Sequence, residues 1–495
     1  MKNISYISTR GQSTPVASAQ AIKQGLANDG GLFMPETIPT LTKEDFDFLK
    51  KATYSERAAY VMAKFLTDYT YDELLEDCTE AYSEARFPGG AAPMTDIDNM
   101  RLLELWHGPT CAFKDMALQV MPRLLSRALT KTDEKRTAFI LVATSGDTGK
   151  AALEGYKDVN GIKIMVFYPV DGVSKIQKLQ MATQEGQNVY VCAIKGNFDD
   201  AQNGVKKIFG NADTAKLLND NGYFFSSANS INWGRLVPQI VYYISSYCDM
   251  VAKGDIKDGE DVNICVPTGN FGNIFAAYIA KMMGLPVNRF ICASNCNNIL
   301  TDFITTGTYD RNRQFHTTIS PSMDILISSN LERLLYVLGG QEKTAAYMKE
   351  LNEKGVYTVS DDIKAKLDEC FSGYFCDEEQ TAKTIKETFE KYNYLIDTHT
   401  AVAVKCAKEY MEKTGDDRKM IVASTASPYK FSSNVYTSLT GKSFENEFDA
   451  LEGTEKLSGT PIPSPLASLK SKAIRFDTVI DPMDMTKEVL KTLGI

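Results

Sequence analysis

Short apolar runs alternate with helical patterns over most of the chain after residue 136. Each run is about as long as a β-strand, is rich in Val, Ile and Phe, and is followed by a stretch with apolar residues at helical spacing. The runs are TAFILVAT, KIMVFYP, NVYVCAI, VNICVPT, VNRFICAS and KMIVAST. Strands that are buried on both faces of a parallel sheet are nearly continuous in apolar character. The pattern therefore predicts an α/β fold with a largely parallel sheet.

Three parts of the chain depart from this alternation. Residues 1–95 are helical and charged and end in the turn-forming run FPGGAAP, which predicts a boundary there. Residues 300–390 are polar and helical, and the pattern gives them no place in the fold. The segment after residue 445 contains GTPIPSPLASLKSK, a composition typical of an extended surface segment.

Composition narrows the classes of function. The chain has 495 residues with 54 Lys and Arg against 63 Asp and Glu, a formal charge of −9. This balance argues against a nucleic-acid surface, which needs a basic stripe to neutralise phosphates. No stretch approaches the ~18 to 20 apolar residues that span a bilayer, and the opening MKNISYISTRGQ has no apolar signal core. We expect a cytoplasmic protein without a membrane or nucleic-acid partner.

Cysteine and histidine are arranged unfavourably for a metal site. The ten cysteines contain no Cys-x-x-Cys pair, and the chain has three histidines. Most of the cysteines lie inside apolar runs, which favours buried free thiols. We therefore expect no metal.

Two loops between a strand and a helix carry glycines and hydroxyls. Pro267-Thr268-Gly269-Asn270-Phe271-Gly272-Asn273 precedes an apolar helix, whose N-terminal amides suit a phosphate. Thr144-Ser145-Gly146-Asp147-Thr148-Gly149 has the same position after an earlier strand. Each loop alone is also compatible with a tight turn or a helix cap. Together they favour a ligand with two anionic ends, because ligands bind beyond the carboxyl ends of parallel strands.

Two further segments carry candidate chemistry. His107-Gly108-Pro109-Thr110-Cys111-Ala112-Phe113-Lys114-Asp115 leads into a helix, and by itself Lys114 is compatible with a surface lysine in a first turn. Ser226-Ser227-Ala228-Asn229-Ser230-Ile231-Asn232-Trp233-Gly234-Arg235 combines small donors with one arginine. An arginine fork beside amides is a good phosphate clamp, although a capped helix start has the same composition.

These segments together resemble the threonine synthases, of the fold type II group of pyridoxal-phosphate enzymes. The matching pieces are Ser8-Thr9-Arg10-Gly11, Asp29-Gly30-Gly31-Leu32-Phe33, HGPTCAFKD, ATSGDTG, SSANSINWGR, PTGNFGN and Ser424-Thr425-Ala426-Ser427-Pro428-Tyr429-Lys430-Phe431, in family order. The resemblance implies a two-lobed, tryptophan synthase β-like α/β fold with a helical N-terminal domain. We expect this domain at residues 1–95, a large cofactor-binding lobe at 96–130 and 240–495, and a small mobile lobe at 131–239.

The resemblance also implies roles for individual residues around pyridoxal 5'-phosphate. Lys114 would form the Schiff base, and Thr425, favoured over Ser424, would place a neutral hydroxyl at the ring nitrogen. The cofactor phosphate would bind Thr268, Gly269, Asn270, Phe271, Gly272 and Asn273. The substrate carboxylate would bind Thr144, Ser145, Asp147 and Thr148, and the substrate phosphate Asn229, Ser230, Asn232 and Arg235, with Lys175 and Gln177 as further candidates. Ser427 stands where the family usually has His.

The family's substrate, O-phospho-L-homoserine, is a dianion of the kind that the loops favour. The resemblance implies loss of the α and β protons, departure of phosphate and addition of water at the β carbon, with Lys114 moving protons. Such a lysine must be partly neutral, which desolvation achieves, and Phe113 and Trp106 are candidates for the apolar walls. We expect a monomer or homodimer.

Three alternatives remain open from the sequence. A phospholyase on the same scaffold would release 2-oxobutyrate, ammonia and phosphate. A β-eliminating dehydratase or cysteine synthase would share the fold, but NSINWGR and the long N-terminal region argue against it. A non-catalytic binding protein would be expected to lack the lysine or the phosphate loop, and both are present.

Overall fold

The larger of two parallel sheets has six strands in the order β13-β10-β9-β14-β4-β3. All neighbouring strands are parallel except β3 and β4. The structure is a computed structural model and describes residues 3–144, 146–170 and 173–495. The six strands are β13 (Phe371–Phe375), β10 (Val287–Ser294), β9 (Val262–Pro267), β14 (Met420–Ser424), β4 (Met100–Glu104) and β3 (Met94–Ile97).

Helices cover both faces of this sheet, which explains why its central strands are apolar throughout. Ile264 of β9 packs in the core that includes α11 (Trp233–Lys253) and α12 (Gly272–Met282). The next residue, Cys265, packs in the core that includes α17 (Thr398–Thr414). Successive side chains of a strand point to opposite faces, so every residue of β9 is buried.

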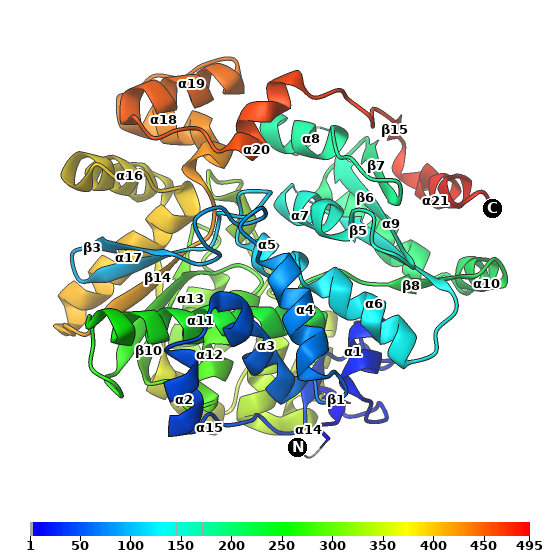
Figure 1. The fold of residues 1–495 in the computed structure, drawn as a ribbon, viewed down its shortest axis with the longest axis horizontal. Helices are drawn as coiled ribbons and strands as arrows, with labels where there is room; N and C mark the ends of the chain where they lie inside the picture. Colours follow the sequence, from blue (N-terminus) through cyan, green and yellow to red (C-terminus); the bar gives the residue numbers. More distant parts are fainter. Residues whose placement is uncertain (1–2, 145, 171–172) are drawn as a thin grey trace.

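The smaller sheet has five parallel strands in the order β15-β7-β6-β5-β8. They are β15 (Val479–Ile480), β7 (Val189–Ile194), β6 (Ile162–Pro169), β5 (Thr137–Ala143) and β8 (Tyr223–Ser226). The helices that follow these strands or join them are α7 (Asp147–Tyr156), α8 (Lys175–Ala182), α9 (Phe198–Phe209) and α10 (Ala212–Asp220). Two lobes, each with its own sheet, confirm the predicted α/β fold class (Figure 1).

The N-terminal helices share a core with the larger lobe. Helix α3 packs against α11, and both belong to one continuous apolar cluster. The helices before the smaller sheet are α1 (Ser18–Gln24), α2 (Lys43–Leu49), α3 (Tyr54–Phe65), α4 (Tyr71–Ala81), α5 (Lys114–Leu118) and α6 (Met121–Lys131). A short antiparallel pair, β1 (Tyr6–Ser8) and β2 (Phe33–Pro35), completes this region.

The polar stretch from 300 to 390 flanks the larger sheet and supplies its edge strand β13. Its helices are α13 (Ile299–Thr306), η1 (Pro321–Met323), α14 (Leu331–Lys354), α15 (Asp361–Cys370) and α16 (Glu378–Tyr392). The strands β11 (Thr308–Asp310) and β12 (Val356–Thr358) pair with each other.

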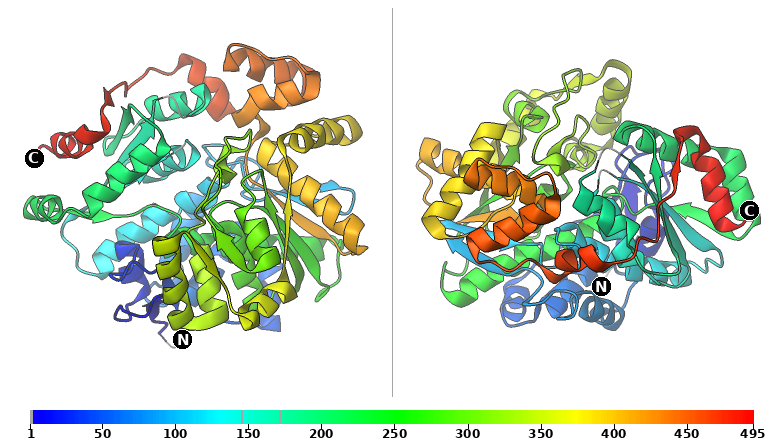
Figure 2. Two further views of the ribbon diagram at one scale, coloured as in Figure 1. Left: turned by 180° about the vertical axis from the view of Figure 1, so that it is seen from behind. Right: turned by 90° about the horizontal axis from the view of Figure 1, so that it is seen from above.

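The C-terminal segment crosses from the larger lobe to the smaller one (Figures 1 and 2). It forms η2 (Pro428–Phe431), α18 (Ser432–Thr440), α19 (Glu447–Ser458), α20 (Ser464–Ala467), η3 (Ser468–Ser471), β15, η4 (Pro482–Asp484) and α21 (Met485–Leu493). The expectation of an extended tail after residue 445 is therefore wrong for α19 and α21.

Apolar burial explains this difference. Met485 and Val489 of α21 are buried in the core on one face of the smaller sheet, beside α9. The resemblance places 240–495 in the larger lobe, yet β15 pairs with β7 and α21 packs against α9 of the smaller lobe. The boundaries at 95, 130 and 239 themselves stay predictions. Within the described ranges, no helix is both long and apolar enough to cross a membrane.

Candidate active site

The predicted site residues lie beyond the carboxyl ends of the strands of both sheets. Lys114 follows β4 of the larger sheet, and Asp147 follows β5 of the smaller one. Their side chains meet: Lys114 Nζ lies 3.4 Å from Asp147 Oδ2. This is where ligands of α/β proteins bind, and it joins two of the loops that the sequence singled out.

A buried turn positions Lys114 at the start of α5. Asp115 is fully buried and accepts hydrogen bonds from the Thr110 amide at 2.8 Å and the Thr110 hydroxyl at 2.7 Å. Burial raises the pKa of Asp115 to about 6, although the Thr110 hydrogen bonds lower it. The Phe113 amide donates to the Thr425 carbonyl at 2.8 Å, so the lysine turn is attached to the segment after β14.

The Lys114 amine is buried among other charges. Burial lowers its pKa, the nearby cations Lys430 and Arg235 lower it further, and Asp147 opposes them. Its Nζ also lies 4.9 Å from the centre of the Phe113 ring. Trp106, the other candidate for an apolar wall, donates from Nε1 to Ser424 Oγ at 3.1 Å. An amine whose pKa is lowered loses its proton more readily, and in the uncharged form it can act as a nucleophile or a base.

The Asp147 carboxylate contacts several polar side chains of the site in addition to Lys114. Its Oδ1 lies 2.7 Å from Lys430 Nζ and accepts from Gln177 Nε2 at 3.0 Å, and its Oδ2 accepts from Ser322 Oγ at 3.2 Å. Burial would raise the pKa of this carboxyl, but Lys430 and Lys114 hold it well below its usual value. The sequence gives no signal for Ser322, and Lys430 lies inside the matching segment 424–431 without an expected role there.

The loop 268–273 ends in an uncapped helix. Phe271 has a φ of 63°, and none of the described side chains caps the first amides of α12. Gly269 has no room for a side chain, since a Cβ there would lie 2.9 Å from the Ser322 carbonyl oxygen. Asn273 accepts from the Tyr242 and Tyr243 hydroxyls through Oδ1, at 2.6 Å each.

Two amide groups near this helix start are buried and unpaired. Asn273 Nδ2 and Asn330 Nδ2 have no hydrogen-bond partner among the described residues. Asn330 Nδ2 would lie 3.3 Å from a Cβ added to Gly272, the first residue of α12. Unpaired buried donors are rare. Together with the free amides of the helix they fit an anionic group, and sequence reasoning missed Asn330.

The first turn of α7 is held by Thr144. Its hydroxyl accepts from the Gly146 amide at 3.0 Å and the Gly149 amide at 2.9 Å. Thr148 is partly exposed, and Ser145 lies outside the described residues. Gln177 reaches this loop through Asp147, whereas Lys175 does not, because its Nζ donates to Asn446 at 3.3 Å.

In the segment before α11, some polar side chains are engaged in hydrogen bonds within the protein, and others are free to contact a ligand. The Asn232 amide donates to the carbonyls of Ile22 and Ser227, at 2.9 Å each, and its oxygen caps α11. Asn229 and Ser230 are partly exposed. Arg235 is 4% exposed and donates to the Ala228 carbonyl, but its Nε has no partner in the described parts of the chain. Burial lowers the pKa of Arg235 to about 10.

The segment after β14 distinguishes two candidate hydroxyls. Ser424 Oγ accepts from Trp106 and lies 3.1 Å from the Thr400 hydroxyl. The Thr425 hydroxyl has no hydrogen bond to another described residue, so it is the one that is available to a ligand. Ser427, at the position of the family His, is fully buried and caps η2 through its contact with the Tyr429 amide.

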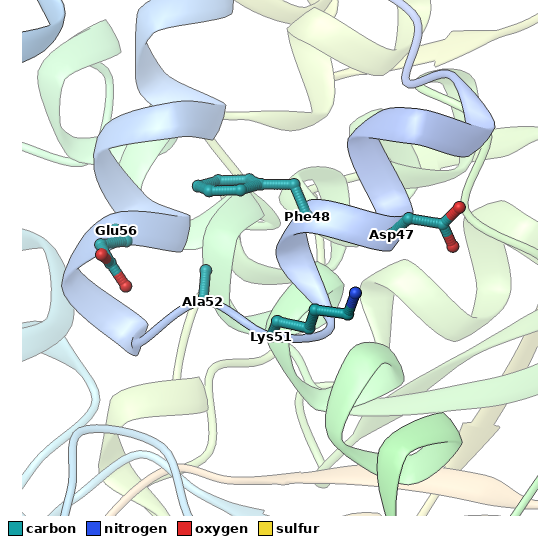
Figure 3. A pocket seen from close by; sticks show the side chains of 5 residues that line it. All are labelled: Asp47, Phe48, Lys51, Ala52 and Glu56. Atoms are coloured by element: carbon teal, nitrogen blue, oxygen red, sulfur yellow. The ribbon is translucent and has the colours of Figure 1, made fainter.

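A surface hollow of about 430 Å³ lies apart from these residues, between α2 and α3 (Figure 3). Its walls are Asp47, Phe48, Lys51, Ala52 and Glu56. None of them belongs to the predicted site, and we assign the hollow no part in the chemistry. Within the described ranges, no group of three or more His, Cys, Asp or Glu side chains is placed to hold a metal ion.

Comparisons with known proteins agree with this geometry. The family "Pyridoxal-phosphate dependent enzyme" matches residues 101–425, "Threonine synthase N terminus" matches 5–82 and "Threonine synthase, C-terminal" matches 400–489. Threonine synthase of Schizosaccharomyces pombe is 36% identical over 501 residues, covering 92% of this chain and 96% of that protein. The chain belongs to the threonine synthase family.

Structural comparison supports the assignment to the threonine synthase family. The crystal structure of PLP-bound threonine synthase from Brucella melitensis matches with a TM-score of 0.87 and 35% identity, covering 99% of this chain and 98% of that one. Threonine synthase-like 1 of Macaca fascicularis is 41% identical over 435 residues, which is 85% of this chain. That match spans 58% of the length of the relative.

Pyridoxal phosphate is the cofactor of this threonine synthase family member, and the described residues fit it. The buried Lys114 amine suits the cofactor aldehyde. The uncapped start of α12, with the unpaired Asn273 and Asn330 amides, suits its phosphate. The available Thr425 hydroxyl suits a neutral ring nitrogen.

Proposed function

We propose that this protein converts O-phospho-L-homoserine and water to L-threonine and phosphate. The observation that carries the proposal is the buried Lys114 amine, 3.4 Å from Asp147, in a chain of the threonine synthase family. The unpaired Arg235 Nε supports a site for the substrate phosphate, and the unpaired donors at the start of α12 support a site for the cofactor phosphate.

The proposed chemistry depends on the protonation of Lys114. Pyridoxal phosphate supplies an electron sink that makes the proton on the substrate α carbon removable. The Lys114 amine binds the cofactor and, once the substrate amine displaces it, takes and returns protons at the substrate carbons. Burial lowers the pKa of this amine and so favours the uncharged form that proton transfer needs.

The remaining proposed residues bind and orient the substrate and the cofactor. Arg235, Asn229 and Ser230 hold the substrate phosphate, while Asn232 positions this segment by capping α11. Thr144, Ser145, Asp147 and Thr148 form the loop for the substrate carboxylate, although the Asp147 side chain itself pairs with lysines. Loop 268–273 would hold the cofactor phosphate, and the Thr425 hydroxyl would donate to the ring nitrogen.

We also propose that residues 131–239 are the lobe that closes over the substrate and excludes water. The contact between Lys114 and Asp147 joins the two lobes and supports this motion as a way to complete the site. A cytoplasmic location, as a monomer or homodimer without a nucleic-acid partner, completes the proposal. All ten cysteines are free thiols, as in a reducing compartment.

The test follows three products at once. Cofactor-loaded protein is incubated with O-phospho-L-homoserine, and phosphate, threonine and 2-oxobutyrate are measured together. We expect threonine in step with phosphate, and no turnover by Lys114→Ala. Phosphate with 2-oxobutyrate in place of threonine would make the protein a phospholyase, and wild-type turnover by Lys114→Ala would remove Lys114 from the site.

A further inference from the structure

A second buried lysine shares the Asp147 carboxylate with Lys114. Lys430 lies in η2, directly after β14, and its side chain is fully buried. Its Nζ lies 2.7 Å from Asp147 Oδ1 and donates to the Thr110 carbonyl at 3.0 Å. Lys114 approaches the other oxygen, Oδ2, at the longer distance of 3.4 Å.

The charges in this cluster do not balance when both lysines are protonated. Two ammonium groups then face one carboxylate, and Arg235 adds a third cation near Lys114. Among the described residues, Asp115 and Cys111, in and before α5, also face Lys430; Lys150 and Glu154 of α7 in turn face Cys111 and Asp115. Buried charges are stable only when they are paired. Asp147 can therefore pair closely with only one of the two lysines.

The contacts decide which lysine that is. Lys430 has the shorter contact with Asp147 and also donates to the Thr110 carbonyl, so two acceptors stabilise a proton on Lys430. Lys114 has one long contact and lies against the Phe113 ring. If Lys430 carries the proton and Lys114 is uncharged, Lys430 and Asp147 form an ion pair of one positive and one negative charge.

We propose that Lys430 is a positioning residue that keeps Asp147 ionised and the Lys114 nitrogen uncharged. This inference rests on the proposed role of Lys114 as the amine that binds the cofactor. Lys430 repels a positive charge on Lys114 and occupies the carboxylate that would otherwise stabilise it. It acts through Asp147 and does not itself touch the reacting atoms.

A purely structural ion pair has a different signature. Lys64 and Asp45 form such a pair, with a distance of 2.8 Å and side-chain exposures of 15% and 10%. They lie on α3 and α2, outside the proposed site. Lys64→Met is the matched control, because it deletes a shielded ammonium without changing the charges around Lys114.

The experiment is a pH titration of the holoenzyme without substrate, followed by the absorbance of the bound cofactor. Its midpoint reports protonation of the nitrogen through which Lys114 holds the cofactor. We expect Lys430→Met to raise the midpoint by about one pH unit or more, the usual effect of removing a neighbouring like charge. Lys430→Arg, which retains the charge, should restore a midpoint near that of the wild type, and Lys64→Met should leave the midpoint unchanged.

A second variant keeps the test decisive if Lys430→Met does not fold. Asp147→Asn removes the anion and should lower the midpoint, the opposite sign. An unshifted midpoint in a folded Lys430→Met or Asp147→Asn variant would overturn the proposal. The titration needs no turnover, so it distinguishes a wrong role for Lys430 from a wrong substrate. As a second readout, the acid limb of the kcat profile of Lys430→Met should move in the same direction as its spectral midpoint.

Discussion

Gly155 sets the distance between the helix that begins with Lys114 and the helix that begins with Asp147. It lies in α7, where a Cβ would stand 1.8 Å from the Leu118 carbonyl oxygen of α5. The obstacle is backbone, so no side-chain rotation relieves it. We therefore expect Gly155→Ala to push α5 and α7 apart at their crossing.

The structure gives the size of this displacement. Real Cβ contacts essentially never fall under 3.0 Å, so the helices must separate by about 1.2 Å. Overpacking of this kind costs about 1 to 3 kcal/mol of folding free energy. The contact of Lys114 with Asp147 is already 3.4 Å long. A displacement of about 1 Å at a reacting group costs about 100-fold in rate, and we expect a loss of that order in kcat.

The assay compares kcat, measured by phosphate release, with the urea midpoint of unfolding. Gly204→Ala is the matched control, because this glycine lies in α9 of the same lobe and its Cβ would meet the flexible Met485 side chain. The control should retain kcat within about twofold, since that side chain can move aside. A Gly155→Ala variant with wild-type kcat and an unchanged midpoint would refute the reasoning.

Three further substitutions test other parts of the site. Arg235→Ala should raise the KM for O-phospho-L-homoserine by about 10- to 100-fold, the value of a hydrogen bond to a charged group, and an unchanged KM would remove Arg235 from the phosphate clamp. Thr425→Val should change the absorbance of the bound cofactor more than Ser424→Ala does, because the Ser424 hydroxyl is already engaged by Trp106; equal spectra would contradict this assignment. The pKa of Asp115 is raised from 3.8 to about 6, so the folded chain holds a proton that the unfolded chain releases. The free energy of unfolding should therefore fall as pH rises from about 4 to 6, by about 3 kcal/mol from this residue. In urea titrations, the free energy of unfolding of Asp115→Asn should not show this fall between about pH 4 and 6. The same pH dependence in the variant and the wild type would contradict a raised pKa for Asp115.

Local patterns in the sequence were enough for the elements that carry the site. The apolar runs before Thr144, Thr268 and Thr425 became β5, β9 and β14, because a strand that is buried on both faces must be apolar at every position. The glycines and hydroxyls after those strands marked the loops, since ligands collect where parallel strands end. The roles of Lys114 and Arg235 came from the resemblance, because residue type alone does not distinguish one buried cation from another.

Tertiary structure alone decided which of these groups meet. Lys430 is separated from Asp147 by most of the chain, yet the two side chains form the shortest charged contact around Lys114. Asn330 comes from the polar stretch that no pattern could place, and β15 joins the smaller sheet from the far end of the chain. Hydrophobic periodicity and helix capping depend on residues that are close in the sequence, so they can be predicted from it. Charge pairing inside the core depends on the order in which distant strands are placed side by side, and only the folded chain determines that order.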